Sequence, residues 1–498
     1  MGQVQDANLP AAKSGATMSR RSLLQGLGWS VVFAALPRGV GFAAESISPV
    51  MAQLSAYMSE ARNRALPDEV VEKAKHHILD TFAAMVSGSD LPPGLAALRF
   101  VRAYGGEKVA TVVGSKMVCG PIEAALANGV MAHADETDDS HGPSQSHPGA
   151  PIVPAALAAG EKFGVAGAHF LRAVVLGYDV GPRVTMSMDA LAFRRDSHKS
   201  THAIAGIFGA AAAAGCAASL DAQQMRWLLD YTAQQSSGIA AWQRDTDHIE
   251  KAFVFGGMPA RSGVTAALLV QSGWTGVDDI LSGPDNFFLA TAPQADPAGL
   301  IEKLGERYEV TRTDIKKWSV GSPIQAVLDA LELLLKKRPF EAEQVLRVIV
   351  RLSATGAATV DNREMPDISL QHMIAVMLLD KTASFHAAHD KPRMQEPAIL
   401  RQRAKVQLVP DEELQRRLPR REAIVEVTLT DGTQFREHVE AVRGTAANPM
   451  TRDEVVAKSR ELMTPILGAA NCAKLIARVL GLENTGDIRE FRPLLQRA

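Results

Sequence analysis

The densest group of side chains able to transfer protons lies between His133 and His147, where three histidines and four acids share one short segment. Apolar, alanine-rich runs precede and follow it, at residues 127–132 and 150–159. Such runs predict buried helices, so the polar segment is expected at the edge of a packed core, within reach of a small substrate. Its candidate residues are His133, Asp135, Glu136, Asp138, Asp139, His141 and His147.

Three kinds of chemistry fit this segment. A histidine beside a carboxylate is held in one tautomer and works as a general acid or base near neutral pH. Histidine and aspartate are also competent metal ligands. A solvated loop that caps the flanking helices would need no chemistry at all. These residues alone leave the three interpretations open.

A second cluster places Arg244, His248 and Lys251 at positions i, i+4 and i+7. On a helix they would form a cationic stripe suited to binding substrate carboxylates. The small residues at 256–257 precede Arg261 and let backbone or ligand approach closely. The alternative is a solvated helix face paired with its own acids.

A third cluster, residues 194–202, ends just before an alanine- and glycine-rich run. Ser200 or Thr201 can cap the helix expected there, which leaves His202 in the first turn. A helix N-terminus lowers a histidine pKa and attracts anions, so a neutral His202 could act as a base beside a substrate carboxylate. Capping without catalysis is the alternative.

The elements that carry these clusters are helices almost throughout residues 47–273, and helical periodicity returns at 452–480. Between them the pattern predicts an α+β unit with strands at 345–352 and 423–430 and a hairpin partner at 434–439. The helices expected in this unit cover 324–336 and 370–379. We therefore expect a mainly α fold with a helical domain at 45–295, an α+β domain at 296–442, and C-terminal helices at 443–498 that pack back on the helical domain.

Composition narrows the possible partners of this 498-residue chain. Its 53 basic and 55 acidic residues give a net charge of −2, which provides no footprint for nucleic acid or an anionic membrane and favours a small-molecule partner. The three cysteines are too few and too far apart for an all-cysteine zinc site or a four-cysteine iron–sulfur cluster, and are expected as buried thiols.

The N-terminus carries a twin-arginine pattern, Ser19-Arg20-Arg21-Ser22-Leu23-Leu24, followed by an apolar run too short and glycine-rich for a membrane span. We expect a leader at residues 1–44, and a periplasmic location if that leader is used. Otherwise the expected location is cytoplasmic.

Taken in this order, the three clusters resemble the MmgE/PrpD family, which includes 2-methylcitrate dehydratase and cis-aconitate decarboxylase. The resemblance covers residues 47–490. Its marks are Asn128-Gly129 through His133, Asp138-Asp139, His147-Pro148-Gly149, Gly206-Ile207-Phe208-Gly209-Ala210-Ala211, Lys251 with Gly256, and Gly273-Trp274-Thr275-Gly276. Together these motifs are specific for the family, whereas each alone would be weak.

The resemblance implies a large all-α domain built from the N- and C-terminal segments and covered by an α+β lid. It also implies a homodimer and chemistry that needs no metal or cofactor. It places the acidic position of the family at Glu136, its hydroxyl at Ser140, its loop histidine at His147 and its lysine at Lys251.

Two family motifs differ in this chain. The histidine of a His-Pro-Thr motif is replaced by Ser200, with His202 two residues later. A Lys-x-Tyr-Pro motif reads Lys316-Lys317-Trp318-Ser319, which loses the tyrosine hydroxyl. Because each proton donor must sit at a particular carbon, these changes alter the expected substrate.

We expect a cofactor-independent lyase of the dehydratase type, acting on a small di- or tricarboxylic acid by removing a proton next to a carboxylate. The expected catalytic residues are His147 and His202, which exchange the proton, Glu136 and Asp139, which orient the histidines, and Lys251. The expected substrate-binding residues are Ser140, Arg244, His248, Arg261, Ser200, Trp318 and Lys317.

His133 and Asp138 are assigned supporting roles. The alternatives are an epimerase or isomerase of a dicarboxylate such as iminodisuccinate, a decarboxylase of an aconitate-like acid, and an exported carboxylate-binding protein without catalysis.

Overall fold

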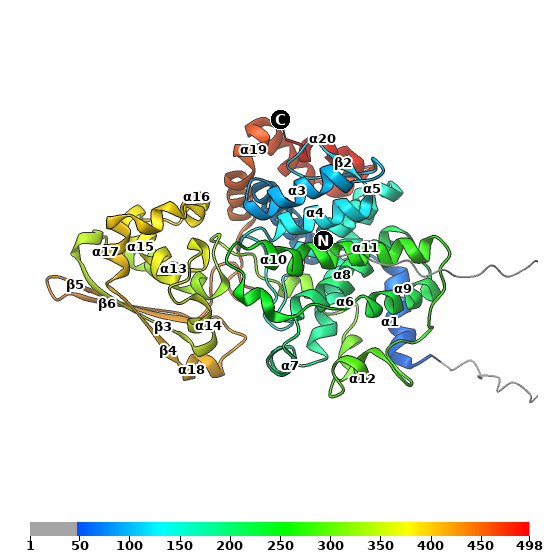
Figure 1. Ribbon diagram of the computed structural model, residues 1–498, viewed down its shortest axis with the longest axis horizontal. Helices are drawn as coiled ribbons and strands as arrows, with labels where there is room; N and C mark the ends of the chain where they lie inside the picture. Colours follow the sequence, from blue (N-terminus) through cyan, green and yellow to red (C-terminus); the bar gives the residue numbers. More distant parts are fainter. Residues whose placement is uncertain (1–46, 498) are drawn as a thin grey trace, which may run out of the picture. The chain divides into compact units, whose positions relative to one another are not determined.

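The computed structural model describes residues 47–497, and the expected leader at residues 1–44 lies outside them. The described chain is mainly helical, as predicted, and folds around two large hydrophobic cores, beside a small cluster of Ala203, Trp242, Val254 and Phe255 (Figure 1). The residues of the first core come from 51–315 and again from 450–495, whereas those of the second come from 318–442. The first core thus continues past residue 296, where the sequence placed the start of the α+β domain.

The helical domain is built from helices near both ends of the chain. Short connections join most of them, and proline occupies the first turn of several, where its missing N–H costs nothing. The helices are α1 (Pro49–Glu60), α2 (Asp68–Gly88), α3 (Pro92–Tyr104), α4 (Pro121–Ala132), α5 (Gly149–Phe163), α6 (Gly167–Met186), α7 (Ala190–Ser197), α8 (Thr201–Ala217), α9 (Ala222–Gln234), α10 (Ile249–Ala252), α11 (Met258–Gln271), α12 (Phe287–Thr291), α19 (Arg452–Leu480) and α20 (Arg492–Leu495). A two-stranded ribbon, β1 (Ala110–Thr111) and β2 (Val118–Cys119), precedes α4.

Helix α8 is buried along its whole length, and its alanines and glycines let neighbouring helices approach closely. A Cβ atom on Gly181 of α6 would collide with the carbonyl oxygen of Ala205 in α8. A Cβ atom on Gly256 would likewise collide with the carbonyl of Gly129 at the end of α4. The first contact allows α6 and α8 to pack closely, and the second sets the turn that follows α10 against α4, which leads into the polar segment.

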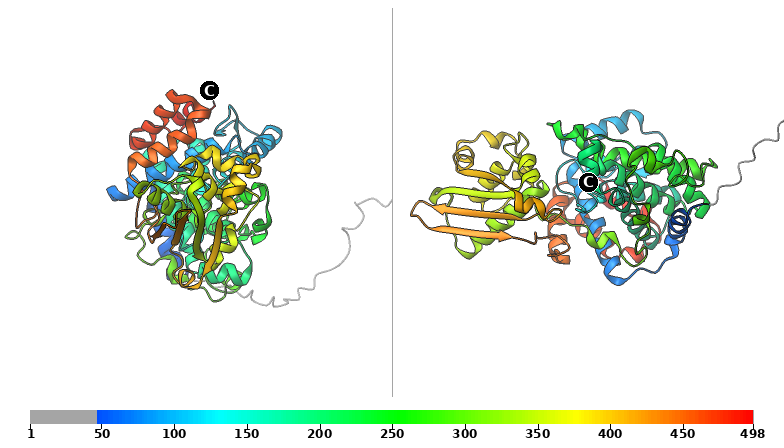
Figure 2. Two further views of the ribbon diagram at one scale, coloured as in Figure 1. Left: turned by 90° about the vertical axis from the view of Figure 1, so that its left-hand side faces the viewer. Right: turned by 90° about the horizontal axis from the view of Figure 1, so that it is seen from below.

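The C-terminal helices return to the helical domain, as the sequence predicted. Helix α19 packs against α2, and Figures 1 and 2 show α19 and α20 (orange to red) beside the N-terminal helices (blue). Lys458 of α19 and Asp80 of α2 form a buried ion pair with an Nζ–Oδ1 distance of 2.6 Å. This pair fixes the two ends of the chain to each other.

The second core belongs to an α+β unit, here called the lid, which contains a four-stranded sheet in the order β4-β3-β5-β6. Strands β3 and β4 are parallel, and the other neighbours are antiparallel. Helices α13 and α15 lie on one face of the sheet (Figures 1 and 2). The elements are α13 (Ser322–Lys337), β3 (Val345–Ser353), α14 (Ala354–Val360), α15 (Leu370–Asp380), α16 (Phe385–His389), α17 (Pro397–Arg403), β4 (Val406–Asp411), α18 (Glu412–Arg416), β5 (Ala423–Leu429) and β6 (Gln434–Val439).

The inner face of this sheet is apolar. Val348 pairs with Val427 and Val350 with Val425, and all four side chains are buried. Such cross-strand pairs of β-branched residues stabilise a sheet by packing on one face. The strands predicted at 345–352, 423–430 and 434–439 are confirmed, whereas β4 was not predicted.

Candidate active site

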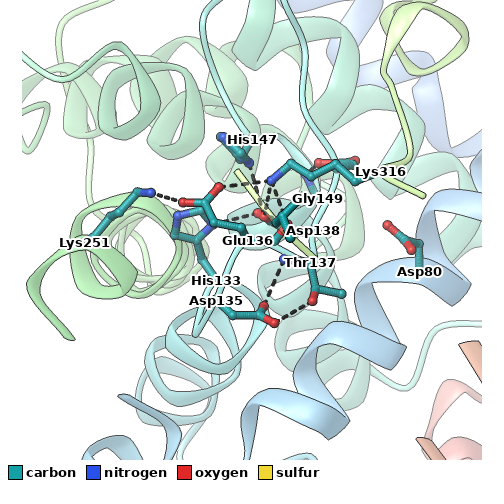
Figure 3. A network of polar contacts seen from close by, with 12 residues as sticks. Asp80, His133, Asp135, Glu136, Thr137, Asp138, His147, Gly149, Lys251 and Lys316 are labelled. Carbon is teal, nitrogen blue, oxygen red and sulfur yellow. Dashed lines mark hydrogen bonds and ion pairs between the residues drawn. The ribbon is translucent and has the colours of Figure 1, made fainter. Parts of the chain in front are cut away.

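The segment from His133 to Pro148 joins α4 to α5 and carries its polar side chains inward. His133, Asp138 and Asp139 are completely buried, and Glu136 and His147 are 4% and 8% exposed. Buried charges are costly unless they are paired. The site is therefore defined by the partners of these side chains, and Figure 3 shows those of His133, Glu136, Asp138 and His147.

Asp138 holds two histidines at once. Its carboxylate oxygens lie 2.9 Å from His133 Nδ1 and 3.2 Å from His147 Nδ1 (Figure 3). Burial opposes ionisation of Asp138, but the two histidines and Lys316 outweigh burial and hold its pKa well below the usual value. Burial lowers the pKa of His147 to about 4, although Asp138 acts in the opposite direction. His147 is thus neutral, donates from Nδ1, and keeps Nε2 free to accept a proton.

His202 lies opposite His147, with 5.2 Å between the two ring centroids. It occupies the first turn of α8, where the Ser200 hydroxyl accepts a hydrogen bond from Ala203 N at 3.3 Å, as the capping argument predicted. The His202 ring stacks on Phe255 at a centroid distance of 3.7 Å, and Trp242 stands edge-on at 5.6 Å. Burial, and then the positive charges of its neighbours, lower the pKa of His202 well below its usual value.

Two lysines share the carboxylate of Glu136. Lys251 of α10 forms an ion pair with one oxygen, and Lys316 Nζ lies 3.3 Å from the other (Figure 3). Lys316 also donates to the Glu136 carbonyl at 3.0 Å and lies 3.5 Å from Asp138 Oδ1. Burial opposes ionisation of Glu136, but the two lysines keep its pKa well below the usual value. Lys251 is the more accessible lysine, with 12% of its side chain exposed against 2% for Lys316.

Asp139 points away from the histidine pair. Its carboxylate accepts from Tyr178 Oη at 2.5 Å and from Gly149 N at 2.9 Å, and it lies 2.9 Å from His77 Nδ1. The sequence assigned Asp139 to orient the reactive histidines. In the structure Asp138 orients His147, and Asp139 anchors the segment to α2, α5 and α6.

The lid contacts the same segment through His389, the last residue of α16. His389 Nε2 lies 3.0 Å from Asp135 Oδ2, and its Nδ1 lies 2.6 Å from the carbonyl of Phe385. Asp135 also accepts from Thr137 N at 2.9 Å and from Thr137 Oγ1 at 2.5 Å. Asp135 and Asp367 overcome the effect of burial and raise the pKa of His389 to about 9.

Arg244, His248 and Lys251 do not share one helix. Arg244 is exposed at the end of a 3₁₀ turn (Ala240–Arg244), and His248 adopts a left-handed conformation with φ 61° before α10 begins. This break turns Arg244 to solvent and directs His248 inward, where its ring centroid lies 5.2 Å from that of His133. The predicted cationic stripe is therefore not present.

Four further predicted residues make no contact with the histidine pair among the described interactions. Ser140 forms a backbone bridge with Asp314, and its side chain lines a cavity together with Lys316. Arg261 is half-buried on α11. Lys317 pairs with Glu332 at 2.5 Å, and Trp318 Nε1 donates to Asp329 at 3.0 Å, so both pack within the lid.

Lys316, Trp242 and Phe255 complete the site but were not among the predicted residues. Lys316 is the first residue of the altered Lys-x-Tyr-Pro motif, so a signal for it was present in the sequence. Trp242 and Phe255 are apolar walls, and no residue pattern distinguished them from core positions.

Two residue sets could offer a metal ion three ligand atoms within 4.8 Å of one another: His133, Asp138 and His147, and His133, Glu136 and His248. Both carboxylates in these sets already contact Lys316, and Glu136 also contacts Lys251. A metal cation there would face ammonium groups at short range, which is repulsive. In this structure the two carboxylates take lysines as their cationic partners.

The sequence matches the models of one protein family along most of its length. The model of the MmgE/PrpD N-terminal domain matches residues 52–299, and that of the MmgE/PrpD C-terminal domain matches residues 318–482. Together the two matches cover most of the chain. The protein belongs to the MmgE/PrpD family.

Several characterised relatives align over almost their full length. A cis-aconitate decarboxylase-like protein of Aspergillus oryzae is 26% identical over 503 residues, covering 90% of this chain and 97% of that protein. The cis-aconitate decarboxylase of Aspergillus terreus is 23% identical over 485 residues, with 90% and 96% covered. The human cis-aconitate decarboxylase is 24% identical over 461 residues, with 86% and 91% covered.

Proposed function

We propose that this protein is a cofactor-independent lyase that acts on a small di- or tricarboxylic acid by transferring a proton at the carbon next to a carboxylate. The observation that carries the proposal is the pair His147 and His202, both buried, both of lowered pKa, and 5.2 Å apart beside a lysine. A histidine that is neutral at physiological pH is ready to accept a proton.

The charges around the pair assign the remaining roles. Lys251 is accessible enough to bind a substrate carboxylate and to stabilise the negative charge that develops on it when the neighbouring proton leaves. Lys316 is almost fully buried and holds Glu136 and Asp138 in place. Asp138 keeps His147 in the tautomer whose Nε2 faces outward.

In the dehydration that we favour, His147 removes the proton from the carbon next to the carboxylate. The protonated His147 then gives this proton to the leaving hydroxyl, directly or through His202, so water departs, a carbon–carbon double bond forms and both histidines return to the neutral state. The low pKa of both histidines supports this order because the resting site begins as a base.

Decarboxylation of an aconitate-like acid is the second candidate, and the names of the relatives support it. There the same histidine pair would supply a proton to carbon as carbon dioxide leaves. This reaction needs a protonated histidine at the start, which a bound polyanion would favour by raising the histidine pKa.

A turnover screen in deuterated water separates the candidates. Citrate-like, aconitate-like and iminodisuccinate-like acids are incubated with the protein and followed by NMR, ultraviolet absorbance and carbon dioxide release. Dehydration gives an absorbing alkene without carbon dioxide, decarboxylation releases carbon dioxide, and epimerisation exchanges the proton without change of mass balance.

The matched controls for this screen are His147→Gln and His386→Gln, the latter an exposed histidine on α16. Turnover that survives His147→Gln unchanged would refute the assigned mechanism. Binding of these acids without turnover of any would indicate the non-catalytic carboxylate-binding protein instead.

We also propose export through the twin-arginine pattern at residues 19–24. Replacing Arg20 and Arg21 together by lysine should retain the protein in the cytoplasm, which cell fractionation measures. An unchanged distribution would contradict this proposal.

A further inference from the structure

Two arginines from different domains lie beside the site without a carboxylate partner. Arg194 belongs to α7 of the helical domain, and Arg421 directly precedes β5 of the lid. Within residues 47–497, neither guanidinium forms a hydrogen bond or an ion pair, whereas their sequence neighbour Arg195 pairs with Asp196 at 2.7 Å. Both side chains are half-buried, and a guanidinium without a counter-charge can form bidentate hydrogen bonds with a carboxylate that enters the site.

Arg421 faces the cavity between the lid and the site segment. Its side chain lines that cavity together with Ser140, Asp314 and Lys316. Asp314 and Glu136 are near enough to act on the charge of Arg421, but burial dominates and lowers the pKa of the guanidinium. Arg421 is thus on the same cavity wall as the lysine that holds Glu136.

Arg194 reaches the site from the other side. Its guanidinium carbon lies 5.3 Å from the centroid of the Trp242 ring, whose edge contacts His202. Burial, and then the positive charge of Arg421, lower the pKa of Arg194. The segments that carry them also meet, since Ala190 of α7 and Pro419 line one hollow.

Other donors around this point lack partners as well. The indole N–H of Trp242 is buried without an acceptor among the described residues, and Nδ1 of His202, which can donate in one tautomer, is buried without a partner. A group of unpaired donors with two unpaired cations is complementary to a carboxylate, whose oxygens accept several hydrogen bonds.

We propose that Arg194 and Arg421 bind a second, distal carboxylate of the substrate, one arginine from each domain. This inference rests on the proposed function, in which Lys251 binds the carboxylate next to the reacting carbon. It selects acids with at least two carboxylates, and it makes the substrate a bridge between the helical domain and the lid.

The test measures binding of propane-1,2,3-tricarboxylate and of glutarate, which lacks its central carboxylate, by isothermal titration calorimetry at fixed ionic strength. Arg194→Met and Arg421→Met should each weaken tricarboxylate binding by about 10- to 100-fold, the range expected for lost hydrogen bonds between charged groups. The exposed neighbours provide matched controls, and Arg195→Met and Arg420→Met should change binding less than about twofold.

Two further readouts distinguish a binding role from a structural one. If both arginines hold the same carboxylate, the double variant should lose much less affinity than the product of the single losses. Because each arginine is unpaired in the free protein, each Met variant should also melt at the same or a higher temperature than the wild type without ligand.

Unchanged affinity in both arginine variants would overturn the proposal, as would failure of the wild type to bind either acid. Loss of affinity together with a lower melting temperature and a fully additive double variant would indicate a structural role and would also overturn it. Weakened binding with no turnover of any acid would uphold the arginine site and remove the lyase. Turnover with unchanged KM in both variants would uphold the lyase and remove the arginine site.

Discussion

The ion pair between His389 of the lid and Asp135 of the site segment predicts how the stability of the protein depends on pH. Replacing His389 by Gln keeps hydrogen-bond donors but removes the charge. His389 Nδ1 lies 2.6 Å from the carbonyl oxygen of Phe385, and Nε2 lies at an ion-pair distance of 3.0 Å from the Asp135 carboxylate without hydrogen-bond geometry. Both contacts favour the imidazolium. The variant therefore lacks one partner of a buried charge pair.

The expected magnitude follows from the pKa of His389, which rises from 6.5 to about 9 on folding. This rise corresponds to about 3 kcal/mol of unfolding free energy. Because the folded pKa is the higher one, the contribution is fully present below pH 6.5 and is lost as the pH rises through about 9. Asp367, whose pKa burial raises to about 7, also faces His389 and supports the imidazolium once ionised.

The assay is urea-induced unfolding of wild type and His389→Gln between pH 5.5 and pH 10, followed by circular dichroism and tryptophan fluorescence. The wild type should be more stable by about 3 kcal/mol at pH 6, and the difference should vanish near pH 10. His386→Gln is the control, because this histidine is exposed on the same helix and its replacement should have no such effect.

A stability difference that does not change with pH would refute the reasoning, since it would show that His389 contributes through packing alone. A difference that increases with pH would have the wrong sign for a histidine of raised pKa. Either result would remove the charged contact between the lid and the site segment.

Three other predictions concern the site itself. His147→Gln should lower kcat by roughly 10²- to 10⁴-fold. Because the pKa of His147 is about 4, wild-type kcat/KM should stay level from pH 8 to about pH 5 and fall only below pH 5. A pH–rate profile that declines near pH 6.5 would contradict this. Asp138→Asn should lower kcat by roughly 10²-fold or more with little change in KM, because the His147 tautomer is released; steady-state kinetics beside an unchanged circular dichroism spectrum would check it. Lys316→Met should cost about 3–5 kcal/mol of unfolding free energy at pH 7, because Glu136 and Asp138 lose a buried cation. Since both carboxylates have lowered pKa values, this loss of stability should shrink as the pH falls below about 4. Urea unfolding at pH 7 and pH 3.5 measures it, and an equal loss at both pH values would contradict the reasoning.

Hydrophobic periodicity was enough to predict most of the elements. The helices expected at 324–336 and 370–379 are α13 and α15, and three of the four strands of the lid lie where alternation placed them. Strand β4 was missed because it is an edge strand with no fully buried position and a proline at 410, so it shows neither alternation nor a continuous apolar run.

The sequence indicated which segments form the site but not which neighbouring side chain faces it. Asp138 and Asp139 are adjacent, yet one contacts the histidine pair and the other contacts Tyr178. Lys316 and Lys317 are also adjacent, yet Lys316 contacts Glu136 in the site whereas Lys317 pairs with Glu332 in the lid. Such choices depend on local backbone turns in a loop, which residue spacing does not specify.

The contact between α2 and α19 has a consequence for biosynthesis. Lys458, which pairs with Asp80 and donates to the Thr137 carbonyl at 2.9 Å, lies 378 residues after Asp80 in the chain. Contacts of such long sequence separation form late, because the loop between them must close first. The lid, whose contacts are far more local, can fold on the ribosome while the N-terminal helices still expose their apolar faces. A chain that stops before α19 would contain every residue assigned to catalysis but would lack the buried cation that joins Asp80 to the Thr137 carbonyl.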